Sequence, residues 1–157
     1  MRVISLIAAL AVAVLCGGCK DAQKRHEQGA KGVVEFHELY NAGKYAEIFA
    51  AADAGFGRSI TLPEFQQFLS AQHDRLGKVI RSTESGWGAS SQSGKTFAVS
   101  MEEGLQVSGG SDKDFVTLSQ KTTFEKGEAA ETFIFVMQNG HALLYDYRVE
   151  SPDLIEK

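Results

Sequence analysis

Two turn signals near the C-terminal end predict three consecutive antiparallel strands. Asn139-Gly140 is typical of a two-residue type I′ turn, and Glu125-Lys126-Gly127 suits a three-residue loop with its glycine in the left-handed conformation. The apolar face of such a meander must be buried against other secondary structure, so the rest of the chain has to pack on it. The predicted strands are Phe115–Phe124, Ala129–Met137 and Ala142–Val149.

The two turns also predict which side chains share a face. Asn139-Gly140 aligns Met137 with Ala142, and the glycine-containing loop aligns Phe124 with Glu128. One face is then apolar and should pack on helices, because alternation marks a sheet with one buried side. The residues predicted on that face are Val116, Leu118, Phe124, Ile134, Val136, Leu143, Tyr145, Tyr147 and Val149. The opposite face would carry Thr117, Ser119, Lys121, Glu131, Phe133, Phe135, Leu144, Asp146 and Arg148.

Three apolar side chains interrupt this second, polar face. Phe133, Phe135 and Leu144 fall together in the predicted register, outside the face that packs on helices. Large exposed apolar patches usually mark contacts with other molecules. We therefore expect these three residues to form an interface, either with a second copy of the chain or with another protein.

The segments before the sheet have helical periodicity. Apolar side chains recur at helical spacing in Ala30–Tyr40 and again in Tyr45–Ala52. A third helix should begin after Thr61, which forms a capping box with Glu64. The fold class is thus α+β, with about three N-terminal helices on a curved antiparallel sheet of four to five strands. Between the helices and the meander we expect a strand over Val79–Trp87, a loop over Gly88–Gly94 and two short strands within Phe97–Val107.

The N-terminus has the pattern of a secretory signal. Arg2 precedes the uncharged apolar run Val3–Leu15, and Gly17-Gly18 leads into Cys19. A cysteine directly after two small residues resembles a bacterial lipoprotein signal, which implies that Cys19 is lipidated and anchors the protein to a membrane. Lys20 is not the aspartate that in this resemblance signals inner-membrane retention, so we expect the outer membrane, facing the periplasm. The alternative is an ordinary cleaved signal peptide.

These features predict the domain organisation and exclude some functions. We expect a signal peptide over 1–18, the lipidated cysteine and a tether over 19–28, one α+β domain over 29–151 and a tail over 152–157. The net charge of −4 and the lack of a basic stripe argue against nucleic-acid binding. Both cysteines lie in the signal region, so we expect neither a disulfide nor a thiolate metal site in the mature domain.

Asp53 to Phe65, DAGFGRSITLPEF, looks like an EF-hand calcium loop. Gly55 and Gly57 occupy positions that need side-chain oxygens, and Arg58 stands where the loop needs glycine. Helix capping accounts for Thr61 and Glu64, so we predict no calcium site. The four histidines lack zinc-ligand spacing, and no cofactor motif occurs, so we predict neither metal nor cofactor.

The polar and aromatic side chains that could line a pocket are few. Asp146 lies inside the strongest strand, where it is a candidate general base or, as we favour, the ion-pair partner of Arg148. His37 lies on the apolar face of its helix, where it either reaches a cavity or is a core residue. Trp87 would line the pocket or anchor the core. The candidate pocket residues are His37, Tyr40, Trp87, Tyr145, Asp146 and Tyr147.

The chain resembles small bacterial secreted proteins with the cone-shaped, cystatin-like fold of nuclear transport factor two and ketosteroid isomerase. The segments that carry the resemblance are YNAGKYAEIF, a capped helix ending in RLG, TTFEKGEAAETFIF and LLYDYRVES. The resemblance implies a cone pocket and a sheet face that often forms dimers. Fold alone does not transfer function. We expect a non-enzymatic binding or protein-interaction module. The alternative is a small-molecule enzyme of the isomerase or dehydratase type, which a buried polar cluster at the open end of the cone would favour.

Overall fold

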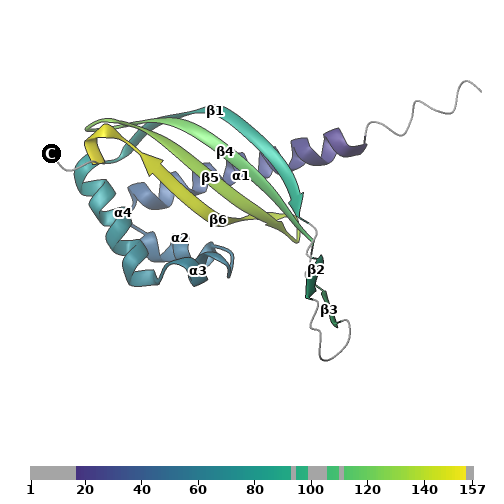
Figure 1. Ribbon diagram of the computed structural model, residues 1–157. Coiled ribbons are helices and arrows are strands. Elements are labelled where there is room, and N and C mark those ends of the chain that lie inside the picture. The colour runs from purple at the N-terminus through teal and green to yellow at the C-terminus, as the bar shows by residue number, and fades with distance from the viewer. Residues whose placement is uncertain (1–16, 93–94, 99–105, 110–111, 155–157) are drawn as a thin grey trace, which may run out of the picture.

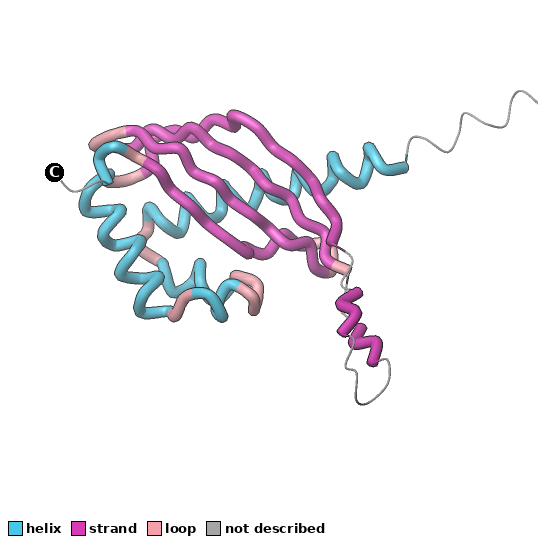
Figure 2. The backbone as a smooth tube through the Cα atoms, in the orientation of Figure 1, coloured by secondary structure: helices cyan, strands magenta, loops and turns pink. Residues whose placement is uncertain are grey.

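Helices and strands follow one another in separate halves of the chain. The computed structural model describes residues 17–92, 95–98, 106–109 and 112–154. Figure 1 shows a curved sheet arching over the first helix, with the other helices on the same side, and Figure 2 shows the same division in the backbone trace. The predicted α+β class is confirmed. The helices are α1 (Gly17–Asn41), α2 (Tyr45–Ala51), α3 (Phe56–Ser59) and α4 (Leu62–Leu76).

The main sheet has four antiparallel strands in the order β1-β4-β5-β6. These strands are β1 (Val79–Gln92), β4 (Lys113–Phe124), β5 (Glu128–Gln138) and β6 (His141–Glu150). A short hairpin of β2 (Lys95–Ala98) and β3 (Gln106–Gly109) forms a separate two-stranded sheet, and each strand extends two residues beyond the range Phe97–Val107 in which two short strands are predicted. A 3-10 turn, η1 (Pro152–Leu154), follows β6.

Helix α1 includes the segment that we expected to be a tether. It is helical from Gly17 onward, so residues 19–28 form its first half. Arg25 Nη1 lies 3.2 Å from Asp114 Oδ1, and His26 Nε2 lies 2.8 Å from Glu84 Oε2, which ties this half to the sheet. Gly32 allows a close approach, because a Cβ there would lie 2.7 Å from the Phe135 ring. The predicted signal residues 1–16 and the end of the predicted tail, 155–157, lie outside the described residues.

Helix α4 begins and ends as its sequence predicts. Thr61 is the N-cap, and its N–H donates to Glu64 Oε2 at 2.8 Å in a capping box. The helix ends at Gly77, whose φ of +76° favours glycine. The Tyr40 hydroxyl donates to the Gly77 carbonyl at 3.1 Å, so α1 holds the end of α4. Within the described part of the chain, no helix is long and apolar enough to cross a membrane.

The turn between β5 and β6 is as predicted, but the turn between β4 and β5 is not. Asn139 and Gly140 both have positive φ, and Met137 pairs with Ala142. Between β4 and β5, however, the Phe124 N–H donates to the Gly127 carbonyl, so the loop has two residues rather than three. The loop packs against the end of α4, where Lys126 N–H donates to the Leu76 carbonyl at 2.9 Å.

The shorter loop shifts the register of β5 against β4 by one residue. Leu118 pairs with Phe133 and Val116 with Phe135, whereas we had predicted Ile134 and Val136 as partners. A one-residue shift moves every side chain of a strand to the other face of the sheet. Phe133 and Phe135 therefore point into the helix-covered core, where they are 0% and 3% exposed.

A bulge in β6 then changes, for a second time, which face of the sheet the side chains point to. Phe135 pairs with Leu144 but Ile134 pairs with Asp146, which leaves Tyr145 as the extra residue. Leu144 is therefore buried beside Phe135. The predicted exposed patch of Phe133, Phe135 and Leu144 is wrong, because all three residues belong to the core.

Strand β1 is longer than predicted, and Trp87 is not in the core. The strand continues through residues 88–92, which we had predicted to be a loop, because these residues pair with β4 as far as Gln92 with Lys113. Trp87 is 43% exposed, and its ring stacks on His26 with the centroids 4.5 Å apart. It therefore covers the seam between α1 and β1 instead of anchoring the interior.

Candidate functional site

A groove of about 530 Å³ separates β6 from α3 and α4. Its helical side is apolar except for Ser59, and its strand side is formed by Ile134 of β5 and by four consecutive residues of β6, 145–148. We call this site the β6 groove. It has the volume and the mainly apolar lining of a ligand site. The side chains of its helical wall are Phe56, Ile60, Phe65 and Phe68.

The helical wall ranges from fully buried to open. Phe65 is 1% exposed, and its ring meets Phe56 edge-on with the centroids 5.1 Å apart. Phe68 is 39% exposed at the rim. The wall therefore combines a rigid aromatic floor with an accessible aromatic side chain, which suits an apolar group entering from solvent.

The two charged side chains at the rim of the groove, Asp146 and Arg148, pair with each other. Arg148 Nε and Nη2 each lie 2.9 Å from Asp146 Oδ2, which confirms the predicted ion pair between these two residues. The Arg148 side chain is 70% exposed, so this pair contributes little to stability. Asp146 is thus engaged by a cation at the surface rather than held in an apolar site.

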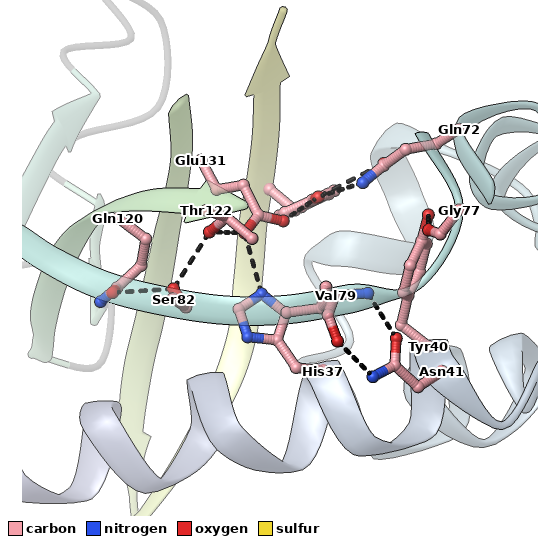
Figure 3. Close-up of polar contacts among 11 residues, drawn as sticks. His37, Tyr40, Asn41, Gln72, Gly77, Val79, Ser82, Gln120, Thr122 and Glu131 are labelled. Atoms are coloured by element: carbon pink, nitrogen blue, oxygen red, sulfur yellow. Dashed lines mark hydrogen bonds and ion pairs between the residues drawn. The ribbon is translucent and has the colours of Figure 1, made fainter. Parts of the chain in front are cut away.

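Glu131 is the most unusual polar residue that the structure describes, because it carries an ionisable carboxyl group and is only 1% exposed. It accepts hydrogen bonds from the Tyr147 hydroxyl and from Thr122 Oγ1. His37 Nε2 lies 2.8 Å from Glu131 Oε2, the oxygen that Thr122 also contacts, whereas Tyr147 contacts Oε1, so α1, β4, β5 and β6 all meet at this carboxyl group (Figure 3). We call Glu131, His37, Thr122 and Tyr147, with Gln72, the Glu131 cluster.

The polar groups around Glu131 have hydrogen-bond partners, either within the cluster or on the neighbouring Ser82. Gln72 Nε2 donates to the Tyr147 hydroxyl oxygen at 3.0 Å, and Ser82 Oγ lies 3.0 Å from Thr122 Oγ1. A buried carboxylate is costly unless such partners surround it. Glu131 does not line the groove, whereas Tyr147 both lines it and belongs to the cluster.

Burial and charge keep the Tyr147 hydroxyl protonated. Burial raises the pKa of Tyr147 well above its usual value, and the negative charge and the hydrogen bond of Glu131 raise it further. Burial also raises the pKa of Tyr40. Tyr147 is therefore a hydrogen-bond donor to Glu131, in a site where no phenolate forms near neutral pH.

The predicted pocket residues divide into three groups. Tyr145, Asp146 and Tyr147 line the groove, and His37 joins them only indirectly, through Glu131. Tyr40 lies apart, with its ring stacked on His73 at 5.0 Å. Trp87 lies on the α1–β1 seam described above.

Glu131, Thr122 and Gln72 belong to the site although none of them is among the residues predicted from the sequence. Glu131 was placed on the outer face because the predicted register was one residue off. The signal for its burial is its spacing, because Glu131 lies two and four residues before Phe133 and Phe135 and therefore shares their face. Phe56 and Phe68, which build the groove wall, come from segments treated as loop or helix without a binding role.

The calcium-like segment is used for structure. Asp53 Oδ1 accepts the Gly55 N–H at 2.8 Å and lies 3.5 Å from Lys113 Nζ, while Glu64 belongs to the capping box. Among the residues that the structure describes, no cluster of three or more histidine, cysteine, aspartate or glutamate side chains could hold a metal ion. No protein-family model matches the chain, and no curated protein or solved structure shows significant similarity to it.

Proposed function

We propose that the protein is a lipid-anchored module of the bacterial cell envelope that binds its ligand in the β6 groove. The observation that carries the proposal is the groove itself, with aromatic side chains on one wall and an edge strand on the other. The floor is buried and preformed, so a ligand gains apolar contacts without reordering the core. This is a binding function without a chemical step.

The hydrogen bonding of the Glu131 cluster supports binding over catalysis. A general base must reach the proton that it removes. Both Glu131 oxygens and the Tyr147 hydroxyl are engaged by protein groups, and Glu131 lies behind the groove rather than in its wall. The alternative, an isomerase or dehydratase acting on a small molecule, is favoured by one observation: Tyr147 connects the groove to a buried carboxylate.

Dye binding tests the groove. Nile red, an apolar dye, should bind the protein and gain fluorescence, and Phe68→Arg should weaken that binding because it places a charge on the wall. Val34→Arg is the matched control, since Val34 is an exposed apolar residue of α1, 56% exposed and outside the groove. Equal effects of the two substitutions would contradict a binding site in the groove.

The location rests on the N-terminal residues and on the resemblance to lipoprotein signals. Cys19 follows Gly17-Gly18 at the end of an apolar run. Metabolic labelling with a radioactive fatty acid should tag the wild type but not Cys19→Ser, and the label should be recovered in the outer-membrane fraction. Equal labelling of both proteins would rule out an acyl anchor at this cysteine.

A further inference from the structure

We propose that the ligand of the β6 groove is an extended polypeptide segment that pairs with β6 and adds a fifth strand to the sheet. This inference rests on the proposed binding function and names its ligand class. The observation behind it is positional. β6 is an edge strand, and four consecutive residues of that strand, 145–148, form one wall of the groove.

An edge strand offers backbone groups that only another backbone matches fully. Alternate residues of an edge strand direct their N–H and C=O groups away from the sheet. At Leu144 the outward carbonyl is already used, because it accepts the Asp53 N–H at 2.9 Å. Beyond it, over 146–150, the described residues make no backbone hydrogen bond outside the ladder with β5.

The Asp53 contact therefore defines one end of the open edge. A partner strand has about five residues of β6 to pair with, from Asp146 to Glu150, which equals the length of an ordinary strand. The bulge at Tyr145 marks the same boundary, since bulges commonly terminate pairing or redirect side chains.

The opposite wall supplies side-chain specificity. Successive side chains of a strand point to opposite faces, so every second residue of the added strand would face α3 and α4. There it meets Phe56, Phe65 and Phe68. The preferred segment therefore carries apolar or aromatic residues at alternate positions, and binding by strand addition with pockets for alternate side chains is an established mode of peptide recognition.

The other edge of the sheet lacks this combination. At the start of β1, the Asn41 side chain bonds both backbone groups of Val79, accepting its N–H at 2.8 Å and donating to its carbonyl at 3.0 Å. The hollow beside β1 is lined by charged and polar side chains, including Arg81, Glu84 and Lys121. In the described part of the sheet, the β6 edge thus has both free backbone groups and an apolar groove beside it, whereas the β1 edge does not.

Backbone methylation of a peptide probe tests the inference on the full-length protein. The probe is a capped six-residue peptide of alternating phenylalanine and threonine. Two derivatives carry N-methyl groups on alternate residues, one derivative for each edge of the peptide. The parent should bind, displace Nile red and shift the amide resonances of residues 146–150. One derivative should lose roughly tenfold or more in affinity, because several backbone hydrogen bonds are lost, while the other binds like the parent.

The outcomes separate the two proposals. If Nile red binds and responds to Phe68→Arg, but the peptide does not compete or both methylated derivatives bind alike, strand addition is overturned and a groove for small molecules remains. If Nile red does not bind, the proposed function itself fails. Ser59→Trp, an exposed position on α3, fills the groove without touching the core and should block the parent peptide as Phe68→Arg does.

Discussion

The Tyr147 hydroxyl donates a hydrogen bond to Glu131, and this contact connects the wall of the β6 groove with the most deeply buried carboxyl group among the residues that the structure describes. Tyr147 is 8% exposed and Glu131 is 1% exposed, so the bond lies in a region of low dielectric constant. The shape of the groove wall is therefore coupled to the stability of the core.

Replacing Glu131 by alanine should strongly destabilise the domain. The substitution leaves Tyr147, Thr122 and His37 without their shared hydrogen-bond partner, and a buried polar group left unsatisfied costs about 1–3 kcal/mol of unfolding free energy. Urea unfolding followed by Trp87 fluorescence measures the loss. Glu128→Ala, an exposed position on the same strand, is the control and should cost little. Equal losses for both variants would contradict a buried hub at Glu131.

Alkaline pH should destabilise the protein, in part through Tyr147. Its pKa is raised in the folded state, so the unfolded chain ionises first, at about pH 10. Above that pH the unfolded state binds fewer protons than the folded state, and the free energy of unfolding falls as pH rises. Tyr147→Phe should make this fall shallower when urea unfolding is repeated across the alkaline range. An unchanged slope would show that Tyr147 titrates normally.

Gly32→Val should destabilise the contact between α1 and the sheet. A Cβ at Gly32 would lie 2.7 Å from the Phe135 ring, which is itself held in the core. Overpacking of this kind costs about 1–3 kcal/mol. Lys31→Val introduces the same side chain at the exposed neighbouring position and is the control. The measured quantity is the difference in unfolding free energy, and no difference between the variants would contradict the close packing.

Millimolar calcium or a chelator should leave the melting temperature unchanged. Glu64 is committed to the capping box with Thr61, and Asp53 is bonded to Gly55 and lies near Lys113. A ligand that binds only the native state raises its apparent stability. A rise of several degrees with calcium, reversed by the chelator, would show that the 53–64 segment binds the ion after all.

Local signals predicted the start of α4 and the last turn correctly. Thr61 and Glu64 define the start of α4 through contacts within one helical turn, and Asn139-Gly140 needs only its own backbone preferences. Features of this kind are readable from sequence because the interacting groups are close together in the chain.

The register of β5 depended on contacts that no local pattern reveals. Glu125-Lys126-Gly127 fits a three-residue loop in isolation, but the loop bonds the end of α4, and Gly127 pairs with Phe124 instead. The bulge at Tyr145 then restored the predicted core orientation of Tyr147, so that residue was placed correctly although its partner was not. The error hid Glu131, and with it the polar cluster of the site.

The continuous helix α1 changes what an acyl anchor at Cys19 would do. A flexible linker would let the domain reorient freely. Here, however, the stretch from Cys19 to Arg25 is helical and spans roughly 9 Å of helix axis, at about 1.5 Å per residue. Arg25 and His26 fasten that stretch to the sheet. With the acyl chain in the bilayer, the helix would act as a short stiff stalk that holds the domain near the lipid surface at a restricted height and tilt.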